Sequence, residues 1–144
     1  MNSNSIFTIG EVAKETGKST HTLRYYERVG LIPQVERSSN GHRRYTEDHV
    51  TWIRFLDRLR LSGMPIHRMQ EYAALVQAGT NNLAERRRIL RAHLADIRKQ
   101  SRALEEYADV VRSKIRFYSK LEKDDQAIWS FPEPSDGRSM DRPD

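Results

Sequence analysis

The segment TIGEVAKETGKSTHTLRYYERVGLI, residues 8–32, carries the local pattern that decides the fold. Thr8 precedes an apolar run and Glu11 follows three residues later, which is the capping-box pattern of a helix N-terminus. Gly17 is placed to end this helix, because glycine readily adopts the left-handed conformation found just past a C-terminus. Ser19 is a second candidate N-cap, and another short helix follows it. Two short helices joined by a tight glycine turn predict a helix-turn-helix.

The sequence LRYY, Leu23–Tyr26, indicates two different faces on the second helix. Leu23 and Tyr26 are three residues apart, so they share a face and are predicted to hold the helix against its own domain. Arg24 and Tyr25 then point outward, one as a cation and the other as a hydroxyl donor, and both groups bind phosphate. The alternative is that these two side chains simply face water.

A small hairpin is predicted after the second helix. Pro33 bars helix, and Asn40-Gly41 is a preferred two-residue hairpin turn because both positions take positive φ readily. The flanking segments, 35–37 and 42–45, are rich in basic residues. We interpret this unit as a wing, and the alternative is an exposed basic turn without a partner.

Two further helices and then a much longer one are expected. Thr46 caps the first, Pro65 begins the second, and Trp52 and Phe55 are most simply core residues. In the third, apolar or small residues recur at alternating steps of four and three, which is the 3.5-residue period of a coiled coil; they are Leu90, Leu94, Ile97, Ser101, Leu104, Ala108, Val111, Ile115 and Tyr118.

A helix of ~40 residues is roughly 60 Å long. It cannot bury its seam against a globule of ~80 residues, so we expect it to pair with a second copy of the chain rather than fold back on its own domain. The large residues of the predicted dimer seam are Leu90, Leu94, Ile97, Leu104, Val111 and Ile115.

Composition narrows the class of protein. The 144 residues contain no cysteine, which excludes disulfides and thiolate metal sites, and their net charge of +5 favours a polyanionic partner. No secretory leader or membrane-spanning stretch is expected, so we expect a cytoplasmic protein. The fold class is mainly α: a winged helix-turn-helix domain over 6–78, a coiled-coil helix over 82–121, and an acidic tail over 122–144 that is expected to be disordered.

Three motifs in this order closely resemble the MerR family of bacterial transcription regulators. They are TIGEVAKETGKSTHTLRYYERVGLI, RSSNGHRRYTEDHV and LRLSGMPIHRM, and the resemblance covers roughly residues 6–121. It implies a homodimer joined by an antiparallel coiled coil, with a winged DNA-binding domain at each end. Such regulators bind promoter DNA with an overlong spacer and distort it, so that RNA polymerase can engage.

The resemblance also implies which residues contact DNA and what the protein senses. The expected DNA contacts are Thr8, Ser19, Thr20, His21, Arg24, Tyr25, Arg37, His42, Arg43, Tyr45 and Arg60. The short form is similar to a subgroup that senses aldehydes or thiol stress, but Arg58 stands where some of that subgroup carry a reactive cysteine. Neither a metal site nor a cofactor is expected, and the sequence does not identify a small-molecule effector.

Other classes of function fit less well. The sequence has no cysteine–histidine arrangement, glycine-rich phosphate loop or inward carboxylate pair that would indicate an enzyme. An architectural DNA-bending protein without an effector is the main alternative, although such proteins usually lack a coiled coil. A coiled-coil adaptor with a basic surface is a third, and substitution of Arg24 and Tyr25 would leave its partner binding intact.

Overall fold

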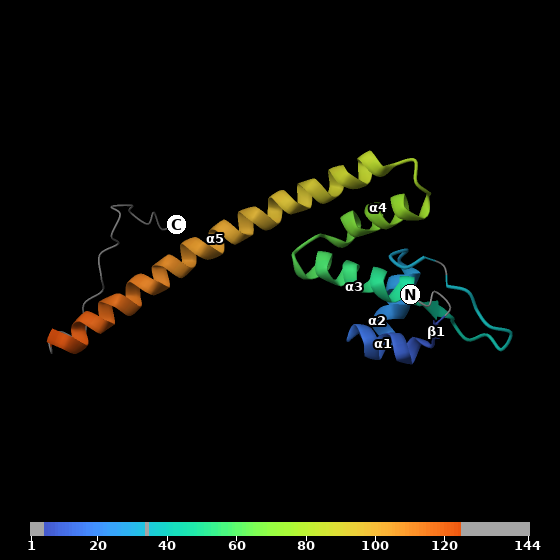
Figure 1. Cartoon of the computed structure of the whole chain (residues 1–144), viewed down its shortest axis with the longest axis horizontal. Coiled ribbons are helices and arrows are strands. Elements are labelled where there is room, and N and C mark those ends of the chain that lie inside the picture. Colours follow the sequence, from blue (N-terminus) through green and yellow to red (C-terminus); the bar gives the residue numbers. More distant parts are fainter. Residues whose placement is uncertain (1–4, 34, 125–144) are drawn as a thin grey trace, which may run out of the picture. The chain divides into compact units, whose positions relative to one another are not determined.

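The computed structural model describes residues 5–33 and 35–124 of the chain (Figure 1). These residues form a mainly helical fold with one very small sheet, as the sequence predicts. The chain divides into two compact units after Ile97. The elements in chain order are β1 (Ile6–Phe7), α1 (Ile9–Thr16), α2 (Thr20–Arg28), β2 (Tyr45–Thr46), α3 (Glu47–Leu61), α4 (Ile66–Gln77) and α5 (Leu83–Asp124).

Local caps set both ends of α1 and the start of α2, and these positions match the prediction. Thr8 and Glu11 form the reciprocal capping box of α1, and Gly17 ends that helix with φ of 71°. The side chain of Ser19 accepts from the backbone N–H of Thr22 at 3.1 Å and caps α2. The ends of these helices are therefore fixed by residues that act on backbone groups within one helical turn.

The hairpin that follows α2 differs from the predicted turn. The backbone N–H of Gly41 donates to the carbonyl of Ser38 at 2.9 Å, and that of Ser38 donates to His42 at 2.8 Å. The loop thus spans 39–41, with Gly41 at φ of 82°, and the prediction of a two-residue Asn40-Gly41 turn is wrong. One glycine in the left-handed region suffices for this longer turn.

A two-stranded sheet joins the N-terminus to the start of α3. β1 pairs with β2 in antiparallel register, with Phe7 opposite Tyr45. Thr46 then caps α3, as predicted, and the third helical residue that completes this capping box is His49.

The core lies where the helix-turn-helix meets α3 and α4. Leu23 is fully buried and Tyr26 nearly so, which confirms that one face of α2 holds it to its domain. Trp52 and Phe55 pack against this core, and the Trp52 ring stacks on Tyr72 at 5.7 Å. The indole N–H of Trp52 donates to the carbonyl of Leu31 at 2.7 Å, which anchors the segment after α2.

α5 is one helix of 42 residues, longer than the other helices of the described part of the chain. Its N-terminal part belongs to the first compact unit, where Ile89 and His93 are buried. His93 Nε2 lies 2.7 Å from the hydroxyl of Ser62, at the end of α3. Residues 122–124 of the expected tail are helical, and 125–144 lie outside the described residues.

Candidate nucleic-acid interface

The outward face of α2 carries the side chains expected to meet DNA. His21 and Arg24 are exposed, and Tyr25 is at the border of exposure with 36% of its surface accessible. The guanidinium of Arg28, which sequence reasoning did not single out, lies 5.6 Å from the centre of the Tyr25 ring. This cation–π contact lies on the exposed side of α2.

Some of the hydroxyl side chains at the N-termini of α1 and α2 already make capping hydrogen bonds. Thr8 and Ser19 each accept a backbone N–H of their own helix, although both are exposed. Thr20, the first residue of α2, is half-buried. The N-terminal turn of α2 nevertheless presents polar groups and the positive end of the helix dipole, which favours a phosphate.

The hairpin carries three basic side chains, and one of them contacts α2. The Nε of Arg43 donates to Glu27 Oε2 on α2 at 2.6 Å, so this ion pair ties the wing to the recognition helix. Arg37 is exposed and donates to the carbonyl of Gly41 at 3.0 Å, which stiffens the turn. His42 is exposed at the tip. The tertiary structure therefore brings α2 and the wing together into one basic surface.

Tyr45 requires a correction. Its side chain is fully buried, with its ring edge against His49 at 5.7 Å between centroids, so it cannot contact DNA. Its hydroxyl has no hydrogen-bond partner among the described residues. Burial, together with the charge of Glu27, raises the pKa of this phenol. The expected DNA contact at this position is instead a core residue, because β2 turns its side chain inward.

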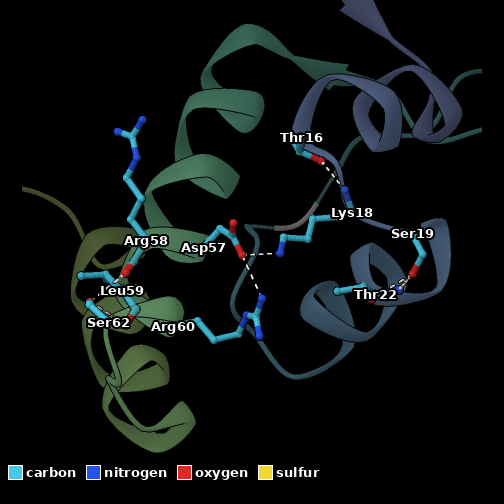
Figure 2. A network of polar contacts seen from close by, with 9 residues as sticks. All are labelled: Thr16, Lys18, Ser19, Thr22, Asp57, Arg58, Leu59, Arg60 and Ser62. Atoms are coloured by element: carbon cyan, nitrogen blue, oxygen red, sulfur yellow. Dashed lines mark hydrogen bonds and ion pairs between the residues drawn. The ribbon is translucent and has the colours of Figure 1, made fainter. Parts of the chain in front are cut away.

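Arg60 belongs to a cluster that the sequence did not indicate (Figure 2). Asp57 Oδ1 accepts from Lys18 of the α1–α2 turn and from Arg60 Nη2 at 3.1 Å. Burial raises the pKa of the Asp57 carboxyl, but the hydrogen bonds from Lys18 and Arg60 more than offset this, and the pKa lies below its ordinary value of 3.8. The pairing of Asp57 with Arg60 follows from their i, i+3 spacing, whereas Lys18 is far away in the chain.

The predicted dimer seam lies along α5 and is largely exposed in the single chain. Leu94, Leu104, Val111 and Ile115 are exposed, and Ile97 is half-buried. Leu90 is also half-buried because it packs against the core of the first unit. Such a row of exposed large apolar residues is expected at a protein–protein contact.

In residues 5–33 and 35–124, no three His, Asp or Glu side chains are grouped as metal ligands. No helix of the same residues is long and apolar enough to cross a membrane.

Comparison with known proteins identifies the family. The model of the MerR HTH family regulatory protein matches residues 7–75, and a second model, MerR, DNA binding, matches 50–113. An HTH-type transcriptional regulator of Haemophilus influenzae is 30% identical over 114 residues, which are 79% of this chain and 84% of that protein. The chain belongs to the MerR family.

Two further proteins are similar to this MerR protein. The HTH-type transcriptional regulator AdhR of Bacillus subtilis is 44% identical over 82 residues, which cover 57% of this chain and 59% of AdhR. The crystal structure of HiNmlR, described as a MerR family regulator lacking the sensor domain and bound to promoter DNA, is 28% identical with a TM-score of 0.72. That match covers 83% of this chain and 90% of HiNmlR.

Membership of the MerR family indicates the general function of the protein. It is a DNA-binding transcriptional regulator, and the proteins it resembles are regulators rather than enzymes. The surface formed by α2 and the wing lies within the matched residues.

Proposed function

We propose that the protein binds a palindromic promoter site in duplex DNA as a homodimer and distorts the spacer to control the access of RNA polymerase. The observation that carries the proposal is the basic surface made by α2 and the wing. Glu27 and Arg43 hold the two elements together, and Arg24, Tyr25 and Arg37 are displayed on them. HiNmlR, bound to promoter DNA, supports the choice of ligand.

In this proposal α2 lies in the major groove. His21 and Thr20 are near its N-terminus, where base edges are read, while Arg24 and Tyr25 bind backbone phosphates. Arg37, His42 and Arg43 of the wing, together with Arg60, extend the phosphate contacts along the duplex; Thr8 and Ser19 contribute polar groups at the helix starts.

The dimer is proposed from α5. A helix of 42 residues spans about 60 Å, and its exposed seam needs a second apolar surface. Because a palindrome has two-fold symmetry, two copies of α2 related by a two-fold axis would read its two halves. Bending or untwisting the spacer would then be offset by contacts made at both half-sites.

The test is a footprint of the purified protein on DNA upstream of its own gene and its neighbours, with Tyr25→Ala beside it. We expect protection of a palindrome within an overlong promoter spacer, and loss of that protection in the variant. Tyr25→Phe removes only the hydroxyl, so it tests whether this group, the proposed phosphate donor, accounts for the loss. Protection outside any promoter would favour the architectural alternative, a DNA-bending protein without an effector.

A further inference from the structure

Three charged side chains meet at the corner of the helix-turn-helix. A single oxygen of Asp57, on α3, accepts from Lys18 and from Arg60 one turn further along the same helix (Figure 2). Their side chains differ in exposure: Lys18 is 15% accessible, Asp57 22% and Arg60 47%. Arg60 is therefore the member of this cluster that most readily reaches an approaching ligand.

The charge balance of this cluster favours an anion. Two cations and one carboxylate leave a net charge of +1. If Lys18 were absent, the pair of Asp57 and Arg60 would be neutral, and a phosphate would be attracted by one member and repelled by the other. With Lys18 present, the carboxylate can hold the guanidinium without cancelling its attraction for phosphate.

The same contacts orient Arg60. An exposed arginine loses rotamer freedom when it binds a phosphate, and it loses less when its guanidinium is already held. Asp57 provides this contact, and the same oxygen of Asp57 is also bound by Lys18. Because Lys18 belongs to the α1–α2 turn, the shared carboxylate links the guanidinium to the helix-turn-helix as well as to α3.

We propose that Asp57 is a positioning residue for DNA binding, which holds Arg60 toward a backbone phosphate while Lys18 offsets its charge. The proposal rests on the proposed function, because it assumes that α2 reads the duplex. Phosphate contacts set the register in which base contacts are made. Release of Arg60 would therefore let α2 shift, and the protein would distinguish its own sequence from others less well.

The experiment uses the full chain and two probes. One is a duplex selected by the wild-type protein from a randomised pool, and the other is a scrambled duplex of equal length and composition. Binding constants are measured for Asp57→Asn, for Arg60→Ala and for the double variant at one salt concentration. Glu71→Gln, which removes one exposed carboxylate of α4, is the matched control.

We expect Asp57→Asn to lower the preference for the selected duplex by about fivefold, in the range of coupled neighbouring residues. The scrambled duplex should bind as tightly as before or more tightly, because a negative charge is lost. In the Arg60→Ala background, Asp57→Asn should change the preference no further, and Glu71→Gln should leave it unchanged. A general loss of folding would weaken both duplexes instead.

Either of two results would overturn the proposal: an unchanged preference in Asp57→Asn, or the same loss with and without Arg60. Circular dichroism checks that each variant is folded. If the asparagine variant is not, Asp57→Ala takes its place with the same expectations, since alanine favours a helix. A wild-type protein that selects no sequence would refute the proposed function itself, before any variant is compared.

Discussion

Arg24 on α2 and Arg43 on the wing are both basic, but their side chains differ in whether an acidic partner holds them. Arg43 is half-buried and paired with Glu27 at 2.6 Å, so part of its charge is already neutralised. Arg24 is exposed on the outward face of α2. The difference affects the free energy of DNA binding. An arginine without an acidic partner contributes fully through the counterion that its phosphate contact releases. An arginine paired with a carboxylate also holds the elements that carry the pair in place.

We predict that Arg24→Ala weakens binding to every duplex, selected or scrambled, because a phosphate contact carries no sequence information. Loss of one contact should lower the slope of log K against log salt by about 0.9. A salt titration by fluorescence anisotropy measures this slope. Arg91→Ala, at an exposed position of α5, should leave the slope unchanged; an unchanged slope in Arg24→Ala as well would rule out the phosphate contact.

Tyr45→Phe provides the opposite test, at a buried residue. The hydroxyl lies in the core without a partner among the described residues, and such burial costs roughly 1 kcal/mol or more. Phenylalanine should therefore raise the free energy of unfolding, by up to about 1 kcal/mol, and leave DNA affinity unchanged. Urea denaturation and a binding titration check the two parts. Weaker DNA binding with unchanged stability would restore Tyr45 to the interface.

At the scale of secondary-structure elements, α3 organises the DNA-binding unit. Its first turn is joined to the sheet through Thr46, its middle holds Leu31 through Trp52, and its last turns carry Asp57 and Arg60. The N-terminal cap is unusual in using a histidine: the backbone N–H of Thr46 donates to His49 Nδ1 at 3.0 Å. This bond requires the neutral ring, because a protonated Nδ1 has no lone pair to accept it.

We predict that this cap makes stability depend on pH. Burial lowers the pKa of His49 below its ordinary value of 6.5, although Asp48 and Glu27 oppose the effect. A lowered folded-state pKa means that the unfolded chain takes up a proton first as pH falls. The contribution is therefore fully present above pH 6.5 and is lost as pH falls from there through the folded-state pKa.

The measurement is the midpoint of thermal unfolding at pH 7.5 and at a pH about one unit below the ordinary histidine pKa. In His49→Gln the amide can still accept from Thr46 but does not titrate, so the decrease between the two pH values should be smaller than in the wild type. His67→Gln, at an exposed position of α4, should keep the full decrease. Equal decreases in all three proteins would show that His49 is not responsible.

At the scale of the whole molecule, assembly is expected to depend on α5. Its C-terminal unit exposes large apolar side chains along the predicted seam, with Leu104 66% and Val111 59% accessible. Ion pairs on α5, such as Arg112 with Glu105 at 3.1 Å, are exposed and contribute little stability. Burial of the seam by a second copy would provide the apolar contact that the single helix lacks.

We predict that Leu104→Lys separates the dimer, because it would bury a charge at the seam. The molar mass from light scattering should fall to that of one chain at micromolar concentration. Ala92→Lys is the matched control: Ala92 is exposed and outside the predicted seam, so the same incoming side chain should leave the mass unchanged. A dimeric mass for Leu104→Lys would refute the seam.

Much of the fold follows from local sequence. Thr8 with Glu11, Ser19 and Gly17 mark the helix-turn-helix because each satisfies a backbone group, or adopts a conformation, within one helical turn of itself. The period of α5 likewise predicted one long helix, since every seam residue repeats the same local rule. The sequence by itself therefore determined the helices, their order and the outward display of Arg24.

Only the tertiary structure determined which polar and basic side chains are accessible to a ligand. Tyr45 follows three basic or potentially basic residues in the chain but lies in the core, because pairing of β2 with β1 turns it inward. Lys18 meets Asp57 only when the helix-turn-helix packs on α3. These partners are far apart in sequence, and their meeting depends on how whole elements pack, which no pattern of neighbouring residues encodes.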